Sequence, residues 1–304
     1  MRGGEDRDEA RRRLSADAST IDYAWGLAEA WSVTSGAIKK TLVRARAATL
    51  LLLVGGATAG AFSASTGTEQ LAVVAALALA FAGMLETFVI TPARSRDWTA
   101  SRMASERLKA AVWLCRTGVG PYAVAADLRP DILAHAIDEI ETQAALEVAR
   151  AMDPVPQPLP GAETTSLPDL YRIERAEDQR KYHRKAGGIE ERSGDRLRIA
   201  VMVFSATGAV LVSLSSVDWF VGGGSLAAIV AALSAATAAI TTYSSSARHH
   251  EIAVAYANTA NRIELATHRF QKKDDSEAAL PDYVAEVEQI LAKQNDTWTG
   301  TIER

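Results

Sequence analysis

The sequence predicts an all-α membrane protein with two transmembrane helical hairpins, four spans in all, and long helices outside the membrane. Three observations support this fold class. Hydrophobic residues make up 48% of the chain and gather in four segments, the charges fill the spaces between them, and the connectors inside each pair of segments are short and lack Lys and Arg. The net charge of -4 gives no basic excess, so no nucleic-acid partner is expected.

The four apolar segments cover 47–64, 70–90, 199–217 and 219–243. At a helical rise of about 1.5 Å per residue, roughly 20 apolar residues cross the hydrocarbon core of a bilayer. A helix of a soluble bundle would show polar residues once per turn, and these segments do not. We therefore interpret them as spans rather than as soluble core helices.

Basic residues flank the hairpins only at the ends of the spans that lie opposite the short connectors. The positive-inside rule then places both short connectors outside the cell and both termini in the cytoplasm. Trp219 and Tyr243 suit the interfacial belts of the fourth span, and an apolar stretch that begins near Ala47 is too late for a cleaved signal peptide. The basic residues are Lys39, Lys40, Arg44, Arg46, Arg94, Arg96, Arg102, Arg192, Arg196, Arg198 and Arg248.

Outside the spans almost every segment reads as helix. The expected helices cover about 6–40, 97–117, 131–151, 169–197, 247–272 and 281–294. Those at 131–151 and 281–294 repeat apolar residues every three or four positions and start at a Pro, so each has one apolar face. We expect them to pack on the helices that leave the membrane, or between subunits.

The sequence predicts that the two hairpins form a parallel tandem repeat. SERLKA at 105–110 aligns with ANRIEL at 260–265, which places Arg107 over Arg262 and Leu108 over Ile263. A Pro-rich stretch separates the halves as a stiff linker. The predicted units are 1–152 with the first hairpin, 153–168 as the linker and 169–304 with the second hairpin.

No constellation of residues predicts catalysis, a metal site or a cofactor. The triple Gly at 222–224 lies in a span and cannot cradle a phosphate. His249 and His250 are adjacent, so on a helix they diverge by about 100° and cannot chelate one ion. The single cysteine, Cys115, is expected to be an inert helix residue, and we expect no enzyme.

Small residues mark the faces on which the spans should pack, because helices in lipid associate through close contacts between their backbones. Gly56 and Gly60 form a GxxxG element in the first span. In the fourth span the candidate packing residues are Ala227, Ala231, Ala235 and Ala239.

The fourth span also carries hydroxyls on one face, at Ser234, Thr237, Thr241 and Ser245. Such hydroxyls can bond back to their own helix, join neighbouring helices or line water. They are therefore the pore-lining candidates, together with Glu86 near the inner end of the second span. That carboxylate either reaches the lipid headgroups or faces the bundle interior on an ion or proton path.

Two stretches resemble the SLATT family of bacterial two-transmembrane proteins. The first is YRIERAEDQRKYHRKAGGIEERSGDRLRIAVMV at 171–203, and the second is WTASRMASERLKAAVWLCRTGVGPY at 98–122. The chain thus resembles two fused copies of that family. The residues that carry the likeness are Tyr171, Arg175, Asp178, Gln179, Tyr182, Lys185 and Ala186 in one copy, and Arg102, Ala104, Glu106, Leu108, Lys109, Trp113, Gly120, Pro121 and Tyr122 in the other.

The resemblance implies a multi-pass effector of the bacterial inner membrane that acts as a pore in conflict or antiphage systems. The implied partners are the lipid bilayer, further copies of the chain, and a nucleotide second messenger or a sensor protein. The competing hypothesis is a membrane-anchored scaffold or sensor that recruits a soluble cytoplasmic partner; a transporter that uses Glu86 has less support. Candidates for gating contacts or for contacts of the cytoplasmic helices are Tyr171, Asp178, Gln179, Tyr182, Arg107 and Lys109.

Overall fold

The computed structural model describes residues 20–147, 155, 157–158, 166–215, 223–273 and 277–302. In these residues the chain is helical, with no strand. Four helices are long and apolar enough to cross a membrane, so the chain is an all-α, multi-pass membrane protein. The linker predicted at 153–168, the connector at 217–218 and Trp219 fall largely or wholly outside the described residues.

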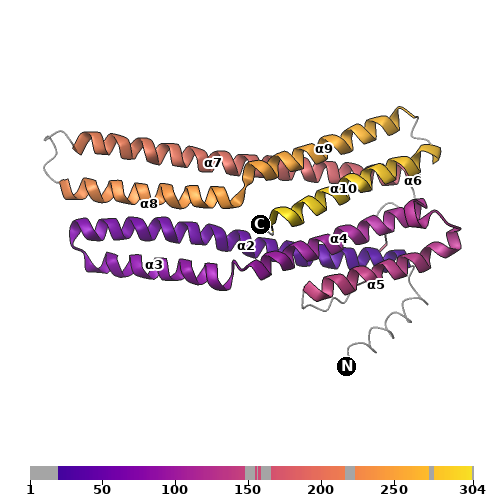
Figure 1. Ribbon diagram of the computed structural model, residues 1–304, viewed down its shortest axis with the longest axis horizontal. Helices are drawn as coiled ribbons and strands as arrows, with labels where there is room; N and C mark the ends of the chain where they lie inside the picture. The colour runs from indigo at the N-terminus through magenta and orange to yellow at the C-terminus, as the bar shows by residue number, and fades with distance from the viewer. Residues whose placement is uncertain are drawn as a thin grey trace, which may run out of the picture. The chain divides into compact units, whose positions relative to one another are not determined.

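The helices divide into two compact units. Unit 1 comprises Met1–Lys39, Ser95–Arg184 and Tyr256–Arg304, and unit 2 comprises Lys40–Arg94 and Lys185–Ala255. The chain passes from one unit to the other within helices α2 (Thr20–Thr66), α4 (Pro92–Thr117), α7 (Asp178–Ser215) and α9 (His249–Gln271). The remaining helices each belong to one unit, and Figure 1 shows the course of the helices along the chain.

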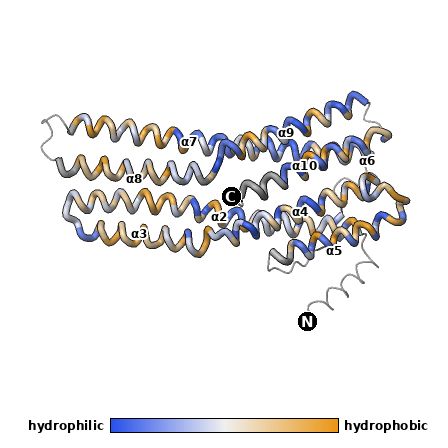
Figure 2. Tube along the Cα trace, viewed as in Figure 1, coloured by the Kyte–Doolittle hydropathy of each residue, from blue (hydrophilic) through white to orange (hydrophobic). Residues whose placement is uncertain are grey.

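Unit 2 contains the apolar parts of two helical hairpins. In the first, α2 is followed by α3 (Glu69–Phe88); in the second, α7 is followed by α8 (Gly223–Ala247). Apolar residues predominate along these parts of the four helices (Figure 2). The turn between α2 and α3 uses Gly67 at φ 70°, a left-handed conformation that glycine adopts without steric cost.

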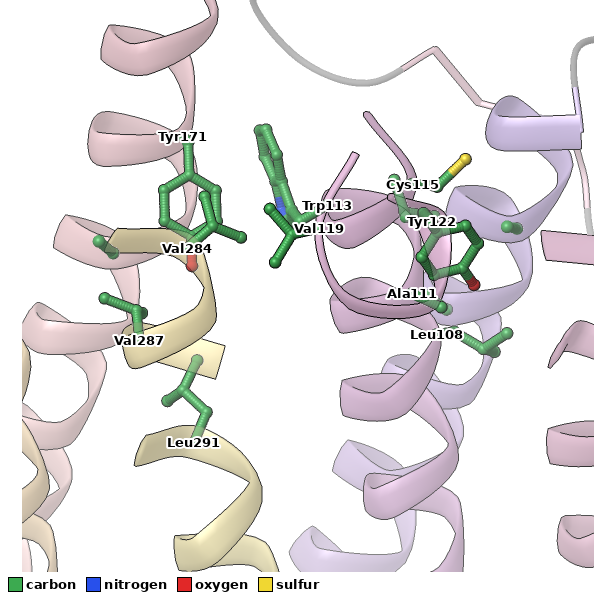
Figure 3. Packing of buried hydrophobic residues seen from close by; sticks show 14 of the residues in the cluster. Leu108, Ala111, Trp113, Cys115, Val119, Tyr122, Tyr171, Val284, Val287 and Leu291 are labelled. Atoms are coloured by element: carbon green, nitrogen blue, oxygen red, sulfur yellow. The ribbon is translucent and has the colours of Figure 1, made fainter. Parts of the chain in front are cut away.

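Unit 1 is built around an apolar core to which helices from both halves of the chain contribute. Besides parts of α2, α4, α7 and α9, it contains α5 (Arg129–Glu147), α6 (Leu167–Tyr171) and α10 (Leu280–Ile302). Trp113 of α4 points toward Tyr171 and Val284 (Figure 3), and all three side chains are fully buried. Leu108 and Ile263, which the sequence alignment superposes, are also fully buried.

Aromatic rings connect the helices of this core in one chain of contacts. Trp25 of α2 meets Trp113 edge-on, Trp113 meets Tyr171 with ring centroids 5.4 Å apart, and Tyr171 meets Tyr283 of α10 at 5.5 Å. Tyr283 then stacks on Phe270 of α9 at 4.4 Å. Edge-to-face pairs of this kind contribute about 0.5–1.5 kcal/mol each beyond the area that they bury.

Within the described residues the helices predicted outside the spans are present, whereas residues 6–19 and 148–151 of two of them lie outside the described residues. At the membrane boundary α2 and α7 each continue as one helix into the apolar segment. Between α8 and α9 the helix does break, at Arg248 with φ 46°. A positive φ is uncommon for a residue other than glycine.

One irregularity interrupts the long helix that starts at α6. The segment η3 (Arg172–Glu177) is π-helical and lies between α6 and α7. Such one-turn insertions are rare and are frequently found at functional sites. Ser166 caps the start of α6, where its hydroxyl accepts a hydrogen bond from the backbone N–H of Asp169.

Candidate functional site

The hydroxyl face of α8 points away from the interior of unit 2. Ser234, Thr241 and Ser245 are exposed and Thr237 is half-buried, whereas Ala232, Ala236 and Ile240 form the buried face of the helix. On an α-helix Ser234 and Ala232 are about 200° apart. Ser234, Thr241 and Ser245 therefore face away from the neighbouring helices that the structure describes, and Thr237 does so only in part.

These hydroxyls differ from others in the spans. Thr58, Thr87 and Ser213 each donate a hydrogen bond to the backbone carbonyl four residues earlier, at 2.8–2.9 Å. No such bond is formed by Ser234, Thr237, Thr241 or Ser245 within the part of the chain that the structure describes. Of the three roles open to these hydroxyls, bonding back to their own helix is thus not used.

The small residues proposed for packing fall into two groups. Gly56 lies against α3, where an added Cβ would stand 3.2 Å from the Cβ of Ala78, and Gly60 faces Ala75. The α8 alanines lie differently: Ala227, Ala231 and Ala235 are exposed and Ala239 is half-buried. The buried alanines of α8 are therefore one position further along, at Ala232 and Ala236.

Glu86 lines a cavity of about 500 Å³ in unit 2. The walls come from α2, the end of α3 and the last turns of α8, and they also include Arg46, Thr49 and Tyr243. The side chains of Arg46 and Glu86 are both exposed. The full set is Arg46, Thr49, Leu50, Leu53, Glu86, Ile90, Ala239, Thr242, Tyr243 and Ala247.

Unit 1 holds a buried ionic cluster that no pattern in the sequence predicts. Arg175 is 2% exposed; its Nε and Nη2 donate to Oε1 and Oε2 of Glu288, both at 3.0 Å, and its Nη1 donates to Glu106 at 3.1 Å. The Tyr171 hydroxyl donates to the same Glu288 Oε1 at 3.0 Å. The cluster thus ties α4, η3 and α10 together.

The cluster shifts the pKa values of its members. Burial alone would raise the pKa of Glu106, but the guanidinium of Arg175, with Lys109 and Arg102, holds it below its ordinary value. Burial would likewise lower the pKa of Arg175, yet the two carboxylates raise it. The pKa of Tyr171 lies well above its ordinary value because burial and Glu288 oppose ionisation. All three side chains therefore keep their ordinary protonation states at neutral pH.

A second polar group lies beside this cluster. Arg102 donates to the hydroxyl of Tyr256 at 3.3 Å and stands over the ring of Tyr182. His183 is buried: its Nδ1 lies 2.6 Å from the carbonyl oxygen of Gln179, and its Nε2 contacts Gln294. Burial lowers the pKa of His183, so its imidazole is neutral at neutral pH.

Of the remaining residues proposed for gating, Lys109 and Arg107 take part in contacts of unit 1, and Asp178 is exposed. Lys109 pairs with Glu29 at 2.9 Å and lies over the ring of Trp25. Arg107 is exposed and contacts Gln143 and Glu139 of α5. Asp178 is exposed at the start of α7.

A polar contact joins a residue that precedes the third span to one that follows the fourth span. His249 is half-buried and its Nδ1 lies 2.7 Å from the carboxylate of Glu190.

Cys115 is buried, and burial raises the pKa of its thiol. Among the described residues no group of three or more His, Cys, Asp or Glu side chains could hold a metal ion.

The two halves of the chain match two different families. Residues 171–298 match the family described as SMODS and SLOG-associating 2TM effector domain 1, the SLATT family, and residues 29–127 match a family of proteins of unknown function, DUF4231. Comparison with curated proteins and with solved structures gave no match. The ionic cluster joins the two matched regions, since Glu106 lies in one and Arg175 and Glu288 in the other.

These matches change the expectation of two fused SLATT copies. The second half is similar to a SLATT domain, whereas the likeness of the first half is to DUF4231. The SERLKA stretch falls in the DUF4231 match, and its residues are of types common in any amphipathic helix. The comparisons therefore support one SLATT domain, at residues 171–298, within a multi-pass membrane protein.

Proposed function

We propose that this chain is an oligomeric membrane effector of a bacterial conflict or antiphage system and forms an ion-conducting pore. The observation that carries the proposal is the outward hydroxyl face of α8. Ser234, Thr241 and Ser245 are exposed on a helix that has no charged side chain. A hydroxyl in hydrocarbon needs a hydrogen-bond partner, and these form none within the described chain.

Two roles remain for this face once bonding back to the helix is set aside. The hydroxyls either join helices of different copies or contact water along a pore axis, and both require several copies of the chain. The exposed alanines beside them, Ala227 and Ala231, allow close approach of another helix. An oligomer with α8 near its axis satisfies the hydroxyls in either way.

Unit 1 is the proposed gate. Helices α2 and α7 run without a break from unit 1 into the apolar segments of unit 2, so a change in the packing of unit 1 acts directly on the spans. The partner expected to cause that change is a nucleotide second messenger or a sensor protein. The orientation expected from the basic flanks places unit 1 in the cytoplasm, where such a signal arises.

The test is ion flux from liposomes that contain the purified protein, measured with and without candidate nucleotides. The variant Thr237→Leu with Thr241→Leu should keep its expression and oligomeric state and lose flux, because leucine removes the hydroxyls from the proposed pore wall. The matched control is Val73→Leu with Val74→Leu, since both valines are exposed on α3. The control should conduct like the wild type.

Normal flux from the α8 variant would remove this helix from the pore. If the wild-type protein shows no flux under any ionic condition or with any candidate nucleotide, the result favours the alternative function. That alternative is a membrane-anchored scaffold or sensor that recruits a soluble partner. The observation that favours this alternative is the well-packed core of unit 1, with its fully buried Trp113 and Tyr171. In that case substitutions on the surface of unit 1 should abolish function while those on α8 are tolerated.

A further inference from the structure

The cavity in unit 2 presents charges of both signs that do not neutralise each other. Its walls include the guanidinium of Arg46 from α2 and the carboxylate of Glu86 from α3. In the described part of the chain neither side chain forms an ion pair. Around these charges the wall is apolar, with Leu50, Leu53 and Ile90.

We propose that this cavity binds the headgroup of a zwitterionic phospholipid, with Arg46 on the phosphate and Glu86 on a primary ammonium. This lipid-binding proposal goes beyond the proposed ion-conducting pore and does not depend on it. Guanidinium groups bind phosphate through paired N–H donors, and carboxylates accept hydrogen bonds from ammonium groups. The apolar wall suits the first carbons of an acyl chain.

The charges of the wall argue against simpler ligands. The carboxylate of Glu86 would repel a lone anion, such as inorganic phosphate or a nucleotide. The guanidinium of Arg46 would likewise repel a lone cation. A ligand that carries both charges a few atoms apart matches both groups at once. A volume of about 500 Å³ also lies within the range of pockets for small ligands, about 300–1,000 Å³.

The place of the cavity along the helices favours a lipid over a soluble zwitterion. Glu86 lies in the last turn of α3, and Arg46 directly precedes the apolar segment of α2. Tyr243, an aromatic residue typical of the membrane interface, lines the same cavity. These positions correspond to the level of the headgroups, where basic pockets between membrane helices bind lipids.

Thr49 provides a second, independent observation. It lines the cavity, is 4% exposed, and its Oγ1 is buried without a hydrogen-bond partner among the described residues. A buried hydroxyl without a partner is unusual and needs an explanation. A phosphate or ester oxygen in the cavity would supply the missing acceptor after a rotation about χ1.

The experiment is native mass spectrometry of the delipidated, full-length protein titrated with phosphatidylethanolamine, phosphatidylcholine or phosphatidylglycerol. The wild type should prefer phosphatidylethanolamine, because the choline headgroup lacks N–H donors and the glycerol headgroup lacks the cation. Glu86→Gln should reduce that preference by about tenfold, the factor expected for one charge-assisted hydrogen bond. Arg46→Gln should weaken the binding of all three lipids.

Matched controls are Lys40→Gln and Glu69→Gln, which remove exposed charges from α2 and α3 outside the cavity; both should bind like the wild type. Soluble phosphoethanolamine serves as a competitor: displacement of the lipid by the soluble compound at comparable concentration would overturn the assignment to a membrane lipid. Equal binding of the three lipids by the wild type, or an unchanged preference in Glu86→Gln, would overturn the proposal. So would a Glu86→Gln variant that changes only the cation selectivity of flux, since that result assigns Glu86 to ion permeation.

Discussion

The two units are stabilised by different means. Unit 1 buries large side chains, among them Trp113, Tyr171 and Leu108, around a paired arginine. In unit 2 the most apolar stretch of α7 contains no buried residue, and the corresponding stretches of α2 and α3 contain few. The buried residues of α3 are small, namely Ala75 and Ala82, and those of α8 are Ala232 and Ala236 together with one larger residue, Ile240.

This difference shows what each unit requires from its surroundings. In water, burial of apolar surface drives folding, so unit 1 can be stable through its own core. In lipid that driving force is absent between helices, and association depends on close packing and hydrogen bonds. Unit 2 as one chain offers little of either, which agrees with the proposal that further copies of the chain pack against it in the bilayer.

The largest expected effect is the loss of the buried arginine. Arg175→Ala should lower the free energy of unfolding of unit 1 by about 3–5 kcal/mol, because Glu288 and Glu106 would remain as buried, uncompensated charges. The measurement is thermal unfolding in detergent followed by tryptophan fluorescence. The control is Arg269→Ala, which removes an exposed pair with Glu286 and should cost at most about 1 kcal/mol. Equal effects of the two substitutions would contradict a special role for the cluster.

The same chemical change in the two units sharpens the comparison. Leu108→Ala in unit 1 should cost about 2–5 kcal/mol, since Leu108 is fully buried. Leu77→Ala on α3 should cost less than about 1 kcal/mol, because Leu77 is 53% exposed and already faces lipid. If Leu77→Ala proves as costly as Leu108→Ala, α3 packs on another helix in the membrane. Both values follow from the same unfolding assay.

Unit 2 should be sensitive only where helices approach closely. Gly56→Leu should destabilise the first hairpin by about 1–3 kcal/mol, because the new side chain would overlap Ala78. Gly83→Leu is the matched control, since an added Cβ at Gly83 meets nothing within 4 Å. Resistance of the purified protein to SDS on a gel should distinguish the two variants. Equal resistance would show that the α2–α3 contact is dispensable.

The smallest effect concerns acid stability. The folded pKa of Glu106 lies below 4.5, its ordinary value, so its contribution to stability is present above that value and is lost as the pH falls through the folded pKa. We expect a thermal midpoint that decreases below about pH 4.5 in the wild type and decreases less steeply in Glu106→Gln. Unfolding scans between pH 7 and pH 3 provide the measurement. Parallel curves for the two proteins would show that Glu106 does not contribute.

The fold could largely be predicted from the sequence, and the contacts could not. Uninterrupted apolar segments have few alternatives to membrane spans, and Gly56 and Gly60 lie against α3 as small residues in spans do. The periodicity of α8 is ambiguous, however, because alanine occurs on all its faces. Its buried face therefore falls on Ala232 and Ala236, one position away from Ala231 and Ala235.

The ionic cluster shows a different limit of sequence reasoning. Glu106, Arg175 and Glu288 are far apart in the chain and stand on helices rich in other charges. Nothing local distinguishes them from solvated residues until the packing of three helices is known. The resemblance to the SLATT family singles out Glu106 and Arg175 but not Glu288, and it does not pair them.

The π-helical segment Arg172–Glu177 sets the rotational phase of the longest helix in the SLATT-like half. One residue more or less in a helix rotates everything after it by about 100°. Because α7 continues unbroken to Ser215, deletion of one residue from this segment would restore a regular helix only by turning Arg175 away from Glu288, or by turning the entire third span about its own axis. The extra residue thus separates two requirements that a uniform helix would tie together: the direction in which Arg175 points and the face that the third span presents. Length changes in this helix are therefore not interchangeable with substitutions, since they alter every contact beyond the point of change at once.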